Sequence, residues 1–155
     1  SNALKFARSS KIPAFHISEK KYPTPQKTDI AIRDCLISHK VNLVIMSGYM
    51  KKVGKFTIAA FPNRILNVHH SLLPNYAGLW GDSVHQAVLS SKEKVTGVTI
   101  HSADSHYDHG PILLQSKVPV LKNDTVETLR SRVQKEEVRA FLKLLQKIQA
   151  GEISL

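Results

Sequence analysis

Short apolar segments alternate along the chain with segments whose apolar residues recur at helical spacing. The apolar segments predict strands at 12–17, 41–46, 64–68, 95–102 and 112–120. The helical spacing predicts helices at 4–8, 29–39, 55–60, 82–91 and from about 124 to 149. Strands that alternate with helices predict an α/β layer fold, with an antiparallel pair formed by the last two strands.

Local signals refine three of these elements. The continuous apolar run at 41–46 is typical of a strand covered on both faces, and the Lys-, Pro- and Thr-rich segment 18–28 is typical of a loop. Asp82 is the candidate N-cap of the helix that follows it. The sequence at 124–127 resembles an N-terminal cap, and Gly151 is placed to end the last helix.

Polar residues stand directly after the apolar pair Ile65-Leu66. In a strand, Asn67 and His69 project from the same face, because side chains alternate with a period of two. An amide and an imidazole on one face can address one reacting atom. This end of the strand is therefore expected to line a site.

A second polar cluster begins with His101 in the strand predicted at 95–102 and continues into the following loop, which contains Asp108. An aspartate beside a histidine holds its tautomer and stabilises the imidazolium that forms when the ring takes a proton. Together the two clusters supply an amide donor for an oxyanion, an imidazole and a carboxylate, which are the parts of an acyl-transfer site. Cys35 lies in an amphipathic stretch and Ser71 lacks a G-x-S-x-G elbow, so direct transfer to an amine is expected.

Composition narrows the class of protein. The 155 residues suit one domain, and 42% hydrophobic with 22% charged residues is ordinary for a globular protein. No apolar run reaches the length of a membrane span, and one cysteine excludes an internal disulfide, so a cytoplasmic location is expected. A net charge of +10 favours anionic partners, but no nucleic-acid motif is present, and we expect neither nucleic acid nor a membrane as partner.

Two motifs carry a family resemblance. Asn67-x-His69-x-Ser71-Leu72-Leu73-Pro74, and Asp108-x-Gly110-Pro111-Ile112 followed by Gln115, resemble the folate-dependent formyltransferase family, and within it the phosphoribosylglycinamide formyltransferases. The resemblance implies a Rossmann-like, mostly parallel sheet with flanking helices. It also implies transfer of a formyl group from the co-substrate 10-formyltetrahydrofolate to the amine of glycinamide ribonucleotide in purine biosynthesis. It runs from about residue 4, so a formyltransferase domain is expected at 4–155, with 1–3 read as a tag remnant.

The resemblance also implies roles for individual residues. Asn67 would donate to the developing oxyanion, His69 would relay a proton, and Asp108 would orient and assist. The residues expected to border the folate pocket are Met50, Lys51, Val53, Ala103 and Asp104. The residues expected on the substrate side are Glu137, His85 and His101, with the loop 78–81 beside the cleft.

No metal is implied. A zinc site of His69, His70, His101 and Asp108 is the rival interpretation, but no H-E-x-x-H or paired Cys/His spacing supports it. His16, His39 and His106 are expected to be structural or surface residues. His109, beside Asp108, is expected either to shape its loop or to have no role.

The sequence departs from the family pattern in three places. His70 stands where a proline is usual, and a His-His-Ser run is reminiscent of formyltetrahydrofolate deformylase, which hydrolyses the same donor. Val138 stands where a histidine usually follows the glutamate. The opening strand and the phosphate-binding loop of the family have no counterpart, so we expect this chain alone to be weakly active or inactive.

Other functions remain open at this level. The protein could be the deformylase, or a non-catalytic remnant of the fold. Methionyl-tRNA formyltransferase shares the Ser-Leu-Leu-Pro core, but 155 residues leave no room for its tRNA-binding domain. An exposed strand edge would also favour a homodimer.

Overall fold

The protein is described here by a computed structural model that covers residues 2–49, 51–106 and 108–155. The elements follow in the order α1 (Asn2–Ser9), α2 (Pro25–Ser38), β1 (Val44–Ile45), α3 (Lys55–Ala60), β2 (Ile65–His69), α4 (Asp82–Ser90), β3 (Val95–Ser102), β4 (Ile112–Pro119) and α5 (Val126–Gln149). Among the described helices, none combines the length and apolar character needed to cross a bilayer.

The strands form one mixed sheet in the order β1-β2-β3-β4. β1 pairs with β2 in parallel, whereas the β2–β3 and β3–β4 pairs are antiparallel. This confirms the predicted α/β class and the predicted late antiparallel pair. The β2–β3 register sets Asn67 opposite His101 and His69 opposite Thr99, so it brings the two polar clusters of the sequence together.

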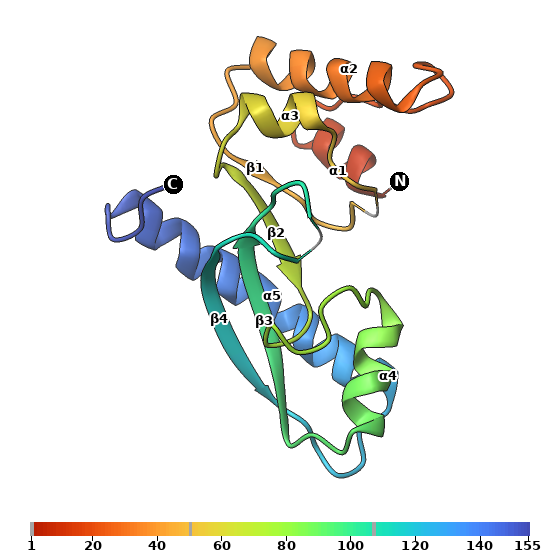
Figure 1. Ribbon diagram of the computed structural model, residues 1–155, viewed down its shortest axis with the longest axis vertical. Coiled ribbons are helices and arrows are strands. Elements are labelled where there is room, and N and C mark those ends of the chain that lie inside the picture. The colour runs from red at the N-terminus through yellow and green to blue at the C-terminus, as the bar shows by residue number, and fades with distance from the viewer. Residues whose placement is uncertain (1, 50, 107) are drawn as a thin grey trace.

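The main core lies between the sheet and α5, which runs across one face of β2, β3 and β4 (Figure 1). Its buried members are Leu66, Val88, Val98, Ile100, Val118, Leu129, Val133, Ala140 and Leu144. The four from α5 recur at near-helical intervals, which gives that helix one apolar stripe. Thr125 caps the start of α5 in a capping box with Thr128, so the predicted cap at 124–127 is confirmed to within one residue.

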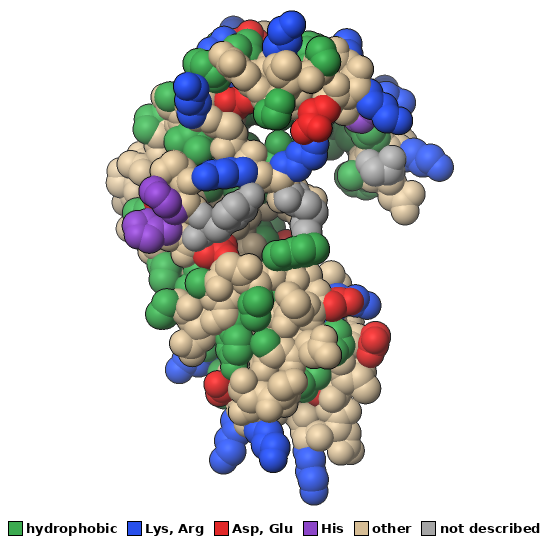
Figure 2. All heavy atoms as spheres, turned by 45° about the vertical axis from the view of Figure 1, so that its right-hand side comes forward, with side chains coloured by type: hydrophobic (Ala, Val, Ile, Leu, Met, Phe, Trp, Pro, Cys, Tyr) green, Lys and Arg blue, Asp and Glu red, His purple; other side chains and the backbone are tan. Residues whose placement is uncertain are grey.

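The helices α1, α2 and α3 gather at the other end of the molecule, beyond β1 (Figure 1). There, Asp29 of α2 caps the start of α3. Its carboxylate accepts hydrogen bonds from the amides of Phe56 (2.9 Å) and Thr57 (3.2 Å) and from the Thr57 hydroxyl (2.5 Å). A Cβ on Gly54 would lie 2.1 Å from the Asp29 carboxyl carbon, so this contact requires glycine. Lys and Arg side chains are spread over both ends of the molecule on the face in Figure 2.

Two strand predictions were wrong. Residues 12–17 lie outside the sheet, because they find no ladder partner among the described residues and Pro13 has no N–H to donate. The strand predicted at 41–46 is reduced to Val44–Ile45, and Ile45 is 41% exposed, so this strand is not covered on both faces.

Two helix starts also differ from the predictions. Helix α2 begins at Pro25 rather than at residue 29, because Thr24 accepts a hydrogen bond from the Lys27 amide and Pro25 suits the first helical turn. The N-cap of α4 is Gly81, not Asp82, and no side chain among the described residues caps this helix. Gly81 has φ 59°, a left-handed conformation that glycine adopts without strain.

Candidate active site

Strand β2 has one face toward the apolar core and carries polar side chains on the other. Leu66 belongs to the core beneath α5 and Val68 packs against it. The alternation of side chains along the strand therefore turns Asn67 and His69 to the opposite face. This confirms the prediction that the two side chains share a face at the carboxyl end of a strand.

Asp108 joins this group from the loop 103–111, which connects β3 to β4. The roots of the loop are fixed by two backbone hydrogen bonds, from the Ala103 amide to the Ile65 carbonyl (2.7 Å) and from the Ser102 amide to the Pro111 carbonyl (2.9 Å). A Cβ on Gly110 would lie 1.8 Å from the Ser102 carbonyl oxygen, so only glycine permits this closure. The fixed roots hold Asp108 beside the end of β2.

His69 faces a carboxylate on one side of its ring and a carbonyl on the other. Its Nδ1 lies 3.3 Å from Oδ2 of Asp108, and its Nε2 lies 3.1 Å from the Tyr76 carbonyl oxygen. Because the carbonyl can only accept, Nε2 carries the proton of the neutral ring. A second proton would bind at Nδ1, where Asp108 stabilises it. Burial lowers the pKa of His69, and the opposing effects of Asp108 and the Tyr76 carbonyl do not restore it.

His101 links the amide to the same carboxylate. Its Nδ1 donates to the Ser102 carbonyl at 3.0 Å, so Nε2 is left for the site. Nε2 lies 3.2 Å from the amide nitrogen of Asn67 and 3.5 Å from Oδ1 of Asp108. The neutral ring accepts a hydrogen bond from Asn67, and the protonated ring would place a positive charge beside Asp108. His101 thus lies beside both Asn67 and Asp108, and its expected role on the substrate side stays a prediction.

Asp108 is nearly enclosed, with 9% of its side chain exposed. Burial alone would raise the pKa of Asp108. The contact with His101, the 3.0 Å hydrogen bond from the Gly78 amide and the neighbouring His69 together hold this pKa below its ordinary value. The carboxyl group is therefore an anion at neutral pH, held between two imidazoles and one backbone amide.

A buried polar network fixes the loop after β2. The Thr99 hydroxyl donates to the Ser71 carbonyl (2.7 Å) and accepts from the Leu73 amide (3.0 Å). The Gln115 amide donates to the Leu73 carbonyl (2.9 Å) and to the Thr99 hydroxyl (3.0 Å). Because these groups are paired on β3 and β4, the loop is held by the sheet, and it carries Tyr76 and Gly78 to the site.

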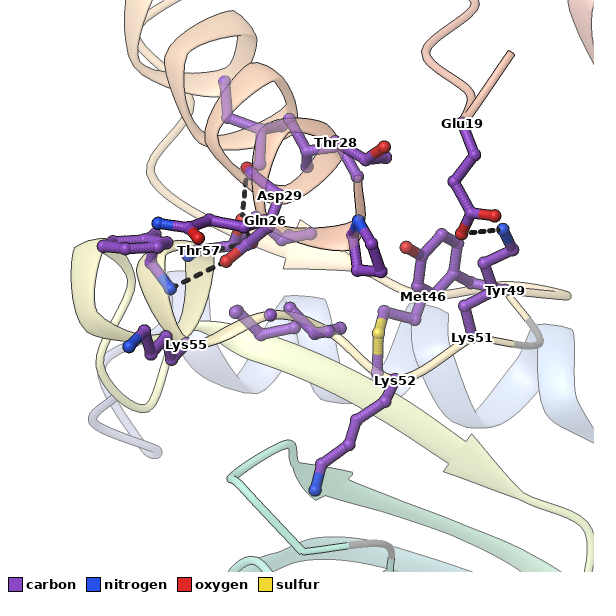
Figure 3. Close-up of a pocket in the computed structure, with 18 of the residues that line it drawn as sticks. Glu19, Gln26, Thr28, Asp29, Met46, Tyr49, Lys51, Lys52, Lys55 and Thr57 are labelled. Carbon is purple, nitrogen blue, oxygen red and sulfur yellow. Dashed lines mark hydrogen bonds and ion pairs between the residues drawn. The ribbon is translucent and has the colours of Figure 1, made fainter. Parts of the chain in front are cut away.

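A cavity of about 470 Å³ lies beyond the other end of β2, between α2, α3 and β1 (Figure 3). Lys51 and Val53, both predicted to border a folate pocket, line it. Ile65 lines it as well, and since Ile65 shares its strand face with Asn67, the cavity opens on the same side of the sheet. Met50 lies outside the described residues, and Ala103 and Asp104 lie in the loop that carries Asp108.

Of the residues predicted on the substrate side, Glu137 is partly exposed, whereas His85 is buried. Glu137, on α5, meets His70, with 2.8 Å between Oε2 and Nε2, and both side chains are partly exposed near the end of β2. His85 is fully buried and neither ring nitrogen has a hydrogen-bond partner. Its ring stacks on that of His70, with 5.7 Å between centroids. In this structure His85 is therefore a packing residue behind His70 rather than part of a cleft wall.

Two backbone groups and one side-chain hydrogen bond were not predicted from the sequence. The Tyr76 carbonyl sets the tautomer of His69, and the Gly78 amide holds Asp108. Backbone groups leave no residue-type signal, although the predicted position of the loop 78–81 beside the cleft pointed to this segment. The pair of His70 with Glu137 was also missed, because it joins residues far apart in the sequence.

Comparison with known proteins identifies the family. The formyl transferase family matches residues 2–145. The trifunctional purine biosynthetic protein adenosine-3 of Chironomus tentans is 34% identical over 98% of this chain and 11% of its own length. The chloroplastic phosphoribosylglycinamide formyltransferase of Arabidopsis thaliana is 39% identical over 90% of this chain and 49% of its own length.

A solved structure gives the same result. The glycinamide ribonucleotide transformylase 1 of Symbiobacterium toebii superimposes with a TM-score of 0.89 at 39% identity, covering 98% of this chain and 70% of that one. This chain thus spans about half the length of the Arabidopsis protein and about a tenth of the trifunctional one. The match over 144 consecutive residues, 2–145, means that the chain belongs to the formyl transferase family.

Proposed function

We propose that this protein transfers a formyl group from 10-formyltetrahydrofolate to the amine of glycinamide ribonucleotide, as a phosphoribosylglycinamide formyltransferase. The observation that carries the proposal is the meeting of Asn67, His69 and Asp108 from two separate segments. His101 lies 3.2 Å from Asn67 and 3.5 Å from Asp108, and Asp108 lies 3.3 Å from His69. The names of the relatives support the same reaction.

In the proposed reaction the amine nitrogen attacks the formyl carbon and a new C–N bond forms. The formyl oxygen gains negative charge, and the Asn67 amide donates a hydrogen bond to it. The attacking nitrogen loses a proton, which His69 accepts and Asp108 stabilises. The adduct then collapses, the bond from the formyl carbon to N10 of the folate breaks, and the proton goes to N10. The products are the formylated ribonucleotide and tetrahydrofolate.

The supporting residues receive roles in keeping with their positions. His101 would position the Asn67 amide, to which it is joined at 3.2 Å. Lys51 and Val53 would border the folate, as lining residues of the cavity beyond β2, together with the loop at Ala103 and Asp104. Glu137 would face the ribonucleotide from α5, with His70 holding its carboxylate. His85 receives no direct contact with substrate, because it is fully buried.

Hydrolysis of the same donor is the second candidate. It is favoured by His70, which stands beside His69 and keeps a partly exposed imidazole near the site. An imidazole there could activate water in place of an amine. The two reactions differ in one respect that can be measured: only the transferase needs the ribonucleotide.

The test follows a ¹³C-labelled formyl group from 10-formyltetrahydrofolate by NMR, with and without glycinamide ribonucleotide. The proposal expects label in the formylated ribonucleotide and little release without it. Formate formed equally in both samples would replace the transferase with the hydrolase. Because the chain alone is expected to be weakly active or inactive, the assay uses a high protein concentration and a long incubation. No label that depends on the ribonucleotide under these conditions, from protein shown to be folded by circular dichroism, would overturn the proposal.

A matched pair of variants ties the activity to the site. Asn67→Ala removes the proposed oxyanion donor, and we expect a loss of about 10²–10³-fold in rate. Asn123→Ala changes an exposed asparagine in the turn before α5, and we expect it to retain the wild-type rate. Equal rates for the two variants would remove Asn67 from the mechanism.

Several broader expectations stay predictions. They are the extent of the domain at 4–155, a cytoplasmic location, a homodimer and a reaction that needs no metal. Sedimentation of the purified protein tests the homodimer. Activity after exhaustive chelation tests the metal-independent reaction.

A further inference from the structure

Three side chains of metal-binding type converge outside the proposed catalytic group. They are Asp104, His106 and His109, all from the loop 103–111. One ligand atom from each lies within 4.8 Å of the other two. Nδ1 of His109 lies 3.2 Å from Oδ2 of Asp104, and the two imidazole rings are 5.6 Å apart between centroids.

The carboxylate of this cluster is already oriented. Oδ1 of Asp104 accepts a hydrogen bond from the His106 amide at 2.6 Å, which leaves Oδ2 on the side of His109. Nδ1 of His106 lies 3.1 Å from the Ser105 hydroxyl, so its Nε2 is the ring atom left for another partner. The roots of the loop are fixed at Ser102 and Ala103, as described above.

We propose that Asp104, His106 and His109 form a binding site for a divalent transition-metal ion, Zn²⁺ before others, with water completing its coordination. Two imidazoles and one carboxylate are ligands that Zn²⁺ accepts readily, whereas Mg²⁺ and Ca²⁺ prefer oxygen alone. Bonds of about 2.0–2.1 Å place tetrahedral ligands roughly 3.3 Å apart, so a small closure of the cluster would complete the site.

The surroundings favour this cluster over the histidines of the candidate active site. There, Nε2 of His69 faces the Tyr76 carbonyl, Nε2 of His70 faces Glu137, and Nδ1 of His101 donates to Ser102. By contrast, the side chain of His109 is 76% exposed and that of Asp104 is 37% exposed, so an ion reaches them from solvent without opening the fold.

The cluster lies in the same loop as Asp108 of the candidate active site. Asp108 lies between His106 and His109 in the same loop, so an ion bound to both histidines would fix the segment that supplies the carboxylate beside His69. An effect of Zn²⁺ on formyl transfer would follow from this and would rest on the proposed function. Binding of the metal itself does not rest on it.

The test titrates the metal-free protein with Co²⁺, whose visible absorption reports its ligands, and then displaces Co²⁺ with Zn²⁺ in the absence of any substrate. We expect one equivalent of Co²⁺ with a tetrahedral or five-coordinate spectrum, full displacement by Zn²⁺, and no displacement by Mg²⁺. His109→Gln and His106→Gln should each weaken binding about tenfold or more. His16→Gln, which changes an exposed histidine elsewhere, should bind as the wild type does.

Two results would overturn the proposal. One is no saturable binding at equimolar metal. The other is equal affinity in the wild type and His109→Gln, which would place the metal on other residues. Because both loop histidines are exposed, the variants are expected to fold, and their circular dichroism checks this.

Discussion

The two ends of the molecule are held together by different forces. Between the sheet and α5, apolar side chains from β2, β3, β4, α4 and α5 are fully or almost fully buried in one cluster. Around α1, α2 and α3, the buried residues of the helices are polar, namely Thr28, Asp29 and Thr57, and α1 has none. Large apolar side chains there remain exposed, as in Phe6 (68%) and Phe15 (54%).

The difference shows which end of the molecule carries the candidate active site. Asn67, His69 and His101 project from strands whose opposite faces form the apolar core, and Asp108 hangs from a loop pinned to those strands. The helical end lines the cavity and is held by hydrogen bonds to one carboxylate, Asp29. The candidate active site thus lies on the end with the apolar core, and the cavity lies at the other end.

Truncating a core residue should change the free energy of unfolding most, and it tests directly whether the two ends differ. Leu129 of α5 is fully buried, and Leu129→Ala should lower the free energy of unfolding by about 3–5 kcal/mol, because it leaves a cavity. Ile37→Ala, at a residue of α2 that is 53% exposed, is the control and should change it by less than about 0.5 kcal/mol. Similar losses of unfolding free energy in the two variants, measured by urea denaturation, would mean that the two ends share one core.

Lowering the pH should reduce the stability of the end that contains the apolar core. The pKa of His85 is lowered from 6.5 to about 4, first by burial, then by His70 and Arg130, against the opposing effect of Asp82. Above pH 6.5 the ring is neutral in both states. As the pH falls from 6.5 to 4, the unfolded chain binds a proton that the folded chain does not, so stability is lost at up to about 1.4 kcal/mol per pH unit.

His85→Leu should remove this contribution. The free energy of unfolding of the variant, measured at pH 7, 6 and 5, should fall less steeply than that of the wild type. Parallel curves would show that another group, not the buried imidazole, governs the loss.

Removing the Asp29 carboxylate should loosen the helical end alone. Asp29→Ala leaves the amides of Phe56 and Thr57 without their acceptor, and we expect a loss of about 1–3 kcal/mol. Hydrogen exchange of α3 should accelerate while that of β3 stays slow. Asp34→Ala, at an exposed residue of the same helix, serves as the control. Faster exchange in β3 as well would show that the ends are coupled.

An exposed ion pair should contribute least. Arg130 and Asp82 lie 2.7 Å apart, with 39% and 58% of their side chains exposed. A double-mutant cycle of Arg130→Ala and Asp82→Ala should give a coupling energy below about 1 kcal/mol, because water and salt screen the pair. A coupling energy above about 2 kcal/mol would contradict this and show that the exposed pair links α4 and α5 strongly.

Elements with strong local signals could be predicted from the sequence. The bounds of α3 at Lys55–Ala60 and β3 at Val95–Ser102 match the prediction, because periodicity and flanking turn residues act locally. Segments 12–17 and 41–46 failed, because a strand also needs a partner, and no periodicity reveals whether one is there. Capping at Thr24 and Gly81 was missed for a related reason, since each cap depends on the backbone angles of one residue.

The candidate site was partly predictable. The convergence of Asn67, His69, His101 and Asp108 is confirmed, whereas their roles stay predictions. Contributions of the backbone, such as the Tyr76 carbonyl, could not be predicted, because any residue type supplies them. Burial of His85 could not be predicted either, because a single histidine in a helix carries no periodic signal that shows whether its side chain faces the core or the solvent.

In the proposed reaction His69 accepts one proton and Asp108 stabilises it, so the two residues act as a unit. The most direct test of this claim is the single-turnover rate of transfer to glycinamide ribonucleotide for the wild type, His69→Ala, Asp108→Ala and the double variant. We predict a loss of about 10²–10⁴-fold for each single change, and little further loss in the double, because residues that act as a unit are not additive. Losses that multiply in the double variant, or single variants with the wild-type rate, would contradict the claim.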